Sequence, residues 1–175
     1  MDEFIRFSEG GEEPILNSLY MIGVGHAKRG RLRDAVFYFD KVLSVEPEHV
    51  NTLTNKGNIL GKLGKYEDAI LTYDKVLKIK PENITSLLNK GLAFHYLKRY
   101  EEAISCYDKV LSIKPNHANT LYHKACTRSL QNDAREALQL LEQAIKMEPQ
   151  FAEKASQDID FGSLRGDARF KALVS

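Results

Sequence analysis

The chain has 175 residues, of which 43% are hydrophobic and 28% are charged, and its formal net charge is +1. This length is sufficient for one domain with a buried core. The near-zero charge lacks the basic excess that binding to nucleic acid requires, so a nucleic-acid partner is not expected.

Residues 1–15 are predicted to form an N-terminal tail or cap. They begin MDEFIRFSEGGEEP, a sequence that is acidic and has no long apolar stretch. We therefore predict neither a signal peptide nor membrane insertion, and we expect a cytoplasmic location. The apolar side chains of Phe4, Ile5 and Phe7 would allow this segment to dock on another surface.

The rest of the chain repeats with a period of 34 residues, which is marked by Pro47, Pro81, Pro115 and Pro149. Other columns keep one kind of side chain at the same step: Leu19, Leu53, Leu87 and Leu121; Gly23, Gly57, Gly91 and Ala125; Ala35, Ala69, Ala103 and Ala137; Phe39, Tyr73, Tyr107 and Leu141. A fixed period of this length predicts an array of repeats. The predicted units are 16–49, 50–83, 84–117 and 118–151, followed by capping helices at 152–175.

Each unit is predicted to be a pair of helices, as its second copy illustrates. Leu53 and Gly57 share one face of a first helix, which would end near Gly64, because glycine readily takes the left-handed conformation of a helix end. A second helix would begin near Tyr66 and end before Pro81, because proline lacks the amide hydrogen that a helix needs.

The glycine and alanine columns predict close contact between the two helices of a unit. Gly57 and Ala69 have little or no side chain, so the backbones can approach there while Tyr73 fills the space beside the crossing. A single pair cannot bury both of its apolar faces, so neighbouring pairs must stack. Apolar side chains of the C-terminal segment would cover the last pair: Phe161, Leu164, Phe170, Leu173 and Val174.

These columns resemble the tetratricopeptide repeat in phase as well as in residue type, from Leu16 to Phe151. The first unit departs from the family pattern at His26, and the fourth departs at Ala125 and Leu141. The resemblance implies an all-α fold, namely a right-handed superhelical solenoid of antiparallel helix hairpins. It also implies a concave groove, lined by the first helices, in which members of the family bind peptides.

No motif of a known catalytic or cofactor site occurs in the chain, whether GxSxG, a P-loop or HExxH. Cys106 and Cys126 lack the spacing of a zinc site or a disulfide framework. His49 and His117 share one repeat column in turns two repeats apart, too far to bind one metal ion, and we expect both to be solvated. The sequence therefore predicts no enzyme, no cofactor and no metal site.

The predicted groove is rich in asparagine, whose amide both donates and accepts hydrogen bonds. Asn55 and Asn89 share one column, so such a row of amides would meet successive peptide groups of an extended ligand, unless the asparagines only face solvent. Tyr20 and Met21 add aromatic and apolar surface to this face. The candidate binding residues are Asn51, Asn55, Asn58, Leu88, Asn89, Leu92, Asn119, Tyr122 and His123.

We therefore expect a non-catalytic interaction module or scaffold that binds a protein or peptide partner. One alternative is self-assembly into a homo-oligomer through the N-terminal segment or the first hairpin. The other is a chaperone co-factor that holds a C-terminal carboxylate, with Thr54, Asn58, Asn89, Asn119 and His123 in the clamp positions of the family. That clamp would be degenerate, because its three cations are missing unless His123 is protonated.

Overall fold

The computed structural model describes residues 12–175, so the docking suggested for Phe4, Ile5 and Phe7 lies outside the described residues. All regular elements in residues 12–175 are helices, and the all-α fold of helix hairpins that the sequence predicts is confirmed. The chain divides into two compact units, one that ends at Ile79 and one that begins at Lys80. In the described range, no helix is both long and apolar enough to cross a membrane.

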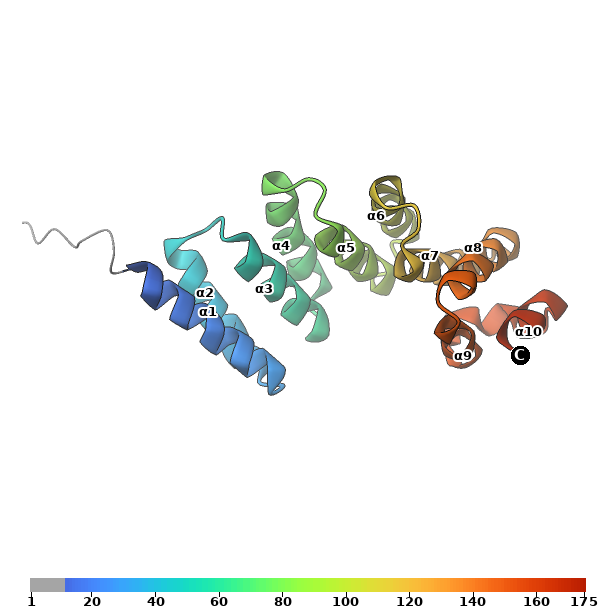
Figure 1. Ribbon diagram of the computed structural model, residues 1–175, viewed down its shortest axis with the longest axis horizontal. Coiled ribbons are helices and arrows are strands. Elements are labelled where there is room, and N and C mark those ends of the chain that lie inside the picture. The colour runs from blue at the N-terminus through green and yellow to red at the C-terminus, as the bar shows by residue number, and fades with distance from the viewer. Residues whose placement is uncertain (1–11) are drawn as a thin grey trace, which may run out of the picture. The chain divides into compact units, whose positions relative to one another are not determined.

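The first unit consists of two antiparallel hairpins that pack on each other (Figure 1). Ala35 and Phe39 of the first hairpin and Ile59 of the second are buried together between them. The helices of this unit are α1 (Glu12–Lys28), α2 (Leu32–Val45), α3 (Val50–Lys62) and α4 (Tyr66–Ile79).

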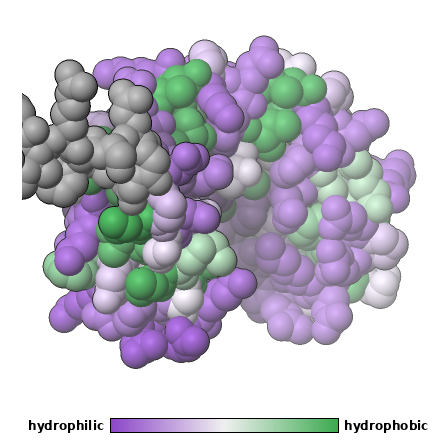
Figure 2. All heavy atoms as spheres, turned by 60° about the vertical axis from the view of Figure 1, so that its left-hand side comes forward, coloured by the Kyte–Doolittle hydropathy of each residue, from purple (hydrophilic) through white to green (hydrophobic). Residues whose placement is uncertain are grey.

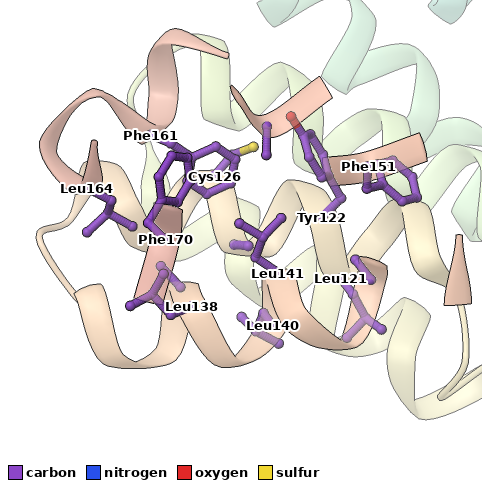
Figure 3. Close-up of a cluster of buried hydrophobic side chains, with 14 of the residues drawn as sticks. Leu121, Tyr122, Cys126, Leu138, Leu140, Leu141, Phe151, Phe161, Leu164 and Phe170 are labelled. Carbon is purple, nitrogen blue, oxygen red and sulfur yellow. The ribbon is translucent and has the colours of Figure 1, made fainter. Parts of the chain in front are cut away.

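The second unit contains two further hairpins and a C-terminal segment of three short helices that packs on the last hairpin. Phe151, Phe161, Leu164 and Phe170 of this segment are buried against α7 and α8, in the cluster that Figure 3 shows. The elements of this unit are α5 (Ile84–Tyr96), α6 (Tyr100–Ile113), α7 (Ala118–Leu130), α8 (Ala134–Met147), α9 (Gln150–Gln157), the 3-10 helix η1 (Ile159–Leu164) and α10 (Ala168–Val174).

Inside each hairpin, the glycine column lies directly under the aromatic column. A Cβ atom added at Gly57 would lie 2.6 Å from Cε1 of Tyr73, and one at Gly91 would lie 2.5 Å from Cε1 of Tyr107. The fourth hairpin has Ala125 and Leu141 at the two positions, and both are fully buried. The smaller leucine leaves room for the methyl group of alanine, so the two columns change together.

The turn between the two helices of each hairpin uses one left-handed residue. Gly30, Gly64, Lys98 and Asn132 occupy the same repeat column, and their φ angles are 74°, 72°, 59° and 62°. Around Gly64, the amide of Lys65 donates to the carbonyl of Leu60 at 2.9 Å, which closes the helix end. The helix stop that the sequence predicts at Gly64 is therefore present, and two hairpins achieve the same stop without glycine.

A second recurrent device starts the first helices. Asn83 caps α5, because its side-chain oxygen accepts from the amide of Ser86 at 2.9 Å. His49 occupies the same column before α3, and its Nδ1 accepts from the amide of Thr52 at 3.3 Å. His117 precedes α7, where its Nδ1 lies 2.8 Å from Oγ1 of Thr120. These histidines are half-buried at helix starts and are not simply solvated in turns.

Ion pairs also recur between neighbouring hairpins. Lys56 pairs with Asp40 of the preceding hairpin at 2.5 Å, and Lys124 pairs with Asp108 at 2.8 Å. Lys124 also contacts Glu136 at 3.1 Å. Burial by itself lowers the pKa of the Lys124 ammonium, but its hydrogen bonds to Asp108 and Glu136 raise that pKa above the usual value. Lys56 and Lys124, which occupy one repeat column, therefore link neighbouring hairpins.

Candidate protein-binding surface

In the first unit, the predicted groove residues of α3 lie beside α1. The Nδ2 atom of Asn55 donates to the hydroxyl of Tyr20 at 2.9 Å, and the Tyr20 ring packs against Phe39 with a centroid distance of 6.1 Å. This bond uses one N–H of the Asn55 amide and leaves its carbonyl oxygen to accept from another group. The core therefore holds this amide in place, which lowers the entropy lost when a ligand binds it.

A cavity of about 340 Å³ opens where α1, α2 and α3 meet. Its floor is apolar, because Leu16 and Val42 are buried there, whereas Asn51 at its edge is exposed. The lining residues are Glu13, Leu16, Asn17, Tyr20, Val42, Glu46, His49 and Asn51. An apolar floor with carboxylate, amide and hydroxyl groups around it can hold a side chain and bond to the peptide groups that flank it. Figure 2 shows hydrophobic and hydrophilic side chains mixed on the face that this view brings forward.

Asn58 has a structural contact of its own. Its side-chain oxygen accepts from the hydroxyl of Tyr73 at 2.9 Å, which ties α3 to α4 within one hairpin. The side chain is half-buried. Replacing Asn58 would therefore disturb the hairpin as well as any ligand, so the exposed Asn51 is a better reporter of binding.

In the second unit, the candidate residues fall into two groups. Leu88, Asn89 and Leu92 are half-buried on α5, and Asn119 is exposed in the first turn of α7. His123 is half-buried further along α7. Burial, together with the positive charge of Lys154, lowers the pKa of His123 to about 4, so this side chain is neutral near pH 7.

Tyr122 lies in the core and not on the predicted groove surface. Its exposed fraction is 0%, and its ring stacks on Phe151 with a centroid distance of 4.8 Å. Its hydroxyl donates to Oδ2 of Asp158 at 2.7 Å. The C-terminal segment covers this position, whereas the equivalent Tyr20 in the first hairpin is only half-buried.

His95, Asp158 and Asp160 meet near Tyr122, a grouping that the sequence pattern does not predict. Nε2 of His95 lies 3.1 Å from Oδ2 of Asp160, and Sγ of Cys126 lies 3.8 Å from Oδ2 of Asp158. One signal in the sequence was available: Asp158 stands one period after Lys124, so a carboxylate follows where the repeats have a lysine. The repeat pattern gives no indication of which side chains this carboxylate would meet.

The helix pairs, their 34-residue period and the capped last hairpin define a helical-repeat protein of the kind that binds other proteins. The tetratricopeptide repeat model matches residues 82–149, and the model of anaphase-promoting complex, cyclosome, subunit 3 matches residues 28–110. Together with the fold, these matches show that the chain is a tetratricopeptide repeat protein.

Several solved structures share this fold. A MamA protein from Desulfovibrio magneticus RS-1, residues 41 to the end, is 19% identical; the match covers 90% of this chain and 92% of that one, with a TM-score of 0.75. A MamA RS-1 double mutant is 20% identical; the match covers 90% of this chain and 88% of that one, with a TM-score of 0.77. YrrB, described as a TPR protein with an unusual peptide-binding site, is 21% identical; the match covers 82% of this chain and 75% of YrrB, with a TM-score of 0.73. At these identities the likeness concerns the fold. No curated protein gave a significant match to the sequence.

Proposed function

We propose that this chain is a non-catalytic interaction module that binds an extended peptide segment on its first helices. The observation that carries the proposal is the cavity of the first unit, which is lined by exposed Asn51 and by Tyr20, the residue whose hydroxyl holds the amide of Asn55. A side chain of the bound peptide would occupy the cavity, and the side-chain amides of Asn51 and Asn55 would form hydrogen bonds with the peptide backbone. Leu88, Asn89, Leu92, Asn119 and His123 would offer further contacts on the second unit.

The strength of such binding follows from the number of amides that take part. Each hydrogen bond to a neutral amide contributes about 0.5–1.5 kcal/mol net. Backbone bonds do not depend on the ligand's side chains, so specificity would come from the side chain in the cavity. YrrB, a protein of similar fold whose structure is described as having an unusual peptide-binding site, supports this kind of role.

The test is a peptide selected by display on the full chain and then titrated against variants. The double change Asn55→Ala and Asn89→Ala removes one amide from each unit, and we expect the binding free energy to weaken by about 1–3 kcal/mol. Helicity should stay unchanged. Asn116→Ala is the matched control, because Asn116 is exposed in a turn outside the predicted groove. Equal affinity of the double variant and the control would refute the proposed row of amides.

The carboxylate-clamp alternative is less well supported by the electrostatics. A clamp needs positive charge around the carboxylate. His123 is the remaining candidate cation at the clamp positions, and its lowered pKa keeps it neutral near pH 7. A peptide that ends in an acidic run should therefore bind weakly, and amidation of its C-terminus should change the affinity little. Tight binding that amidation abolishes would reverse this ranking.

Self-association is a second candidate function, favoured by the outer face of α1. Ile22 is 43% exposed, at the column where Lys56 and Lys124 pair with the preceding hairpin. Ile15 on the same helix is 61% exposed. An apolar residue here fits a second copy of the chain better than a charged partner. If copies associate through this face, Ile22→Lys, which restores the lysine of the other repeats, should reduce the mass measured by light scattering to that of a monomer.

A further inference from the structure

The cavity of the first unit has an acidic rim. Its lining includes Glu13 from the first turn of α1 and Glu46 from the end of α2, and both residues are exposed. The two helices run antiparallel, so the start of α1 and the end of α2 lie at the same end of the hairpin. Neither lysine nor arginine occurs among the described residues that line the cavity. The site therefore combines two carboxylates with an apolar floor.

The stability of α2 does not explain the glutamate at position 46. Glu46 is the C-terminal cap of α2, and the dipole of a helix favours a cation at that end over an anion. The next two hairpins have Lys80 and Lys114 in this column, and Lys114 caps the end of α6. Glu148 caps α8, but its carboxylate accepts from Nε2 of Gln150 at 2.7 Å. Within the part of the chain that the structure describes, the Glu46 carboxylate has no such partner.

The apolar floor suits a long side chain that ends in a charge. Leu16 and Val42 line the cavity and are 8% and 1% exposed. The methylene groups of lysine and arginine pack on apolar surface of this kind, while their charged ends reach polar groups. A charged end that leaves the floor toward the rim would meet the carboxylates of Glu13 and Glu46. Hydrogen bonds between charged groups are stronger than those between neutral groups.

We propose that the peptide segment bound at this cavity carries a lysine or an arginine, whose charge is held by Glu13 and Glu46. The inference rests on the proposed function and adds the chemical class of the peptide. The hydroxyl of Tyr20 accepts from Asn55 and keeps its own proton to donate to a peptide carbonyl, so backbone and side chain would be recognised by different groups. An acidic segment would be repelled by the same two carboxylates.

Two matched peptides test the requirement for charge. One is acetyl-Ala-Ala-Arg-Ala-Ala-amide, and the other has citrulline, which keeps the shape of arginine without its charge. Each is titrated into the isotope-labelled full chain, and the NMR signals of the backbone amides of Leu16 and Asn51 report binding at the cavity. We expect the arginine peptide to bind about tenfold more tightly than the citrulline peptide. Added salt should weaken the binding of the arginine peptide, because salt screens the charges.

A protein variant assigns this preference to the acidic rim. Glu46→Gln should weaken binding of the arginine peptide about fivefold and change binding of the citrulline peptide little. Glu48→Gln is the matched control, because Glu48 is exposed in the same turn but does not line the cavity. Both substitutions keep the size of the side chain, and circular dichroism checks that both variants are folded.

Three results would overturn the inference: equal affinity of the two peptides, no signal change at the cavity with the arginine peptide, or equal effects of Glu46→Gln and Glu48→Gln. The proposed function is decided separately, by the display-selected peptide and the double variant Asn55→Ala and Asn89→Ala. If that variant weakens binding while the charge of the peptide does not matter, the function stands and the inference about a basic residue fails.

Discussion

The close packing of Gly57 under the ring of Tyr73 gives the sharpest test of how the hairpins are built. In Gly57→Ala, the new methyl group would lie 2.6 Å from Cε1 and 2.9 Å from Cζ of Tyr73. Carbon atoms in contact normally lie about 3.5–4.0 Å apart. The ring, which is 2% exposed, would have to move by about 1 Å inside a packed core.

The magnitude follows from two opposing effects. Overpacking of a core costs about 1–3 kcal/mol. Alanine is the better helix former by about 1 kcal/mol, which offsets part of that cost. We therefore expect Gly57→Ala to lower the free energy of unfolding by up to about 2 kcal/mol. Gly61 is the matched control in the same helix: an added Cβ there meets nothing within 4 Å, so Gly61→Ala should stabilise the chain.

A double-mutant cycle then assigns the cost to the ring. The fourth hairpin packs Ala125 with Leu141, so Tyr73→Leu should accommodate Gly57→Ala and recover about 1–3 kcal/mol of coupling energy. Tyr73→Phe keeps the ring but removes the hydroxyl that donates to Asn58, so it should recover nothing. Urea unfolding followed by circular dichroism measures all of these variants. Equal stabilisation by the two alanine changes, or equal rescue by phenylalanine and leucine, would refute the reasoning.

Three further predictions concern other parts of the described chain. Lys98→Gly should raise the free energy of unfolding by about 0.5–1 kcal/mol, because Lys98 is exposed with a φ angle of 59°, a conformation that glycine takes without strain. An unchanged midpoint of urea unfolding would contradict this. Phe161→Ala should cost about 3–5 kcal/mol, since this side chain is fully buried under the last hairpin, and calorimetry should show the loss. Lys124→Met should destabilise the chain more than Lys56→Met. The side chain of Lys124 is 12% exposed and contacts two carboxylates, whereas that of Lys56 is 25% exposed and contacts Asp40. Equal melting temperatures of the two variants would show that this difference in burial does not matter.

The position of Tyr122 shows where sequence reasoning about the surface fails. Tyr20, Thr54, Leu88 and Tyr122 share one column on the first helices, so the pattern alone assigns them the same surface. The C-terminal segment differs from the repeats, and it supplies a ring and a carboxylate that enclose Tyr122 from positions 29 and 36 residues further along the chain. The 34-residue pattern therefore gives no information about contacts with a segment that does not repeat.

The sequence by itself determined the helix hairpins, their boundaries at glycine and proline, and the family, because helix formation and close helix contact depend on residue types at short spacing. The grouping of His95, Cys126, Asp158 and Asp160 was decided only by the tertiary structure. These residues come from a third hairpin, a fourth hairpin and the cap, and no spacing rule joins them. The path by which the last segment folds back onto α7 brings them together.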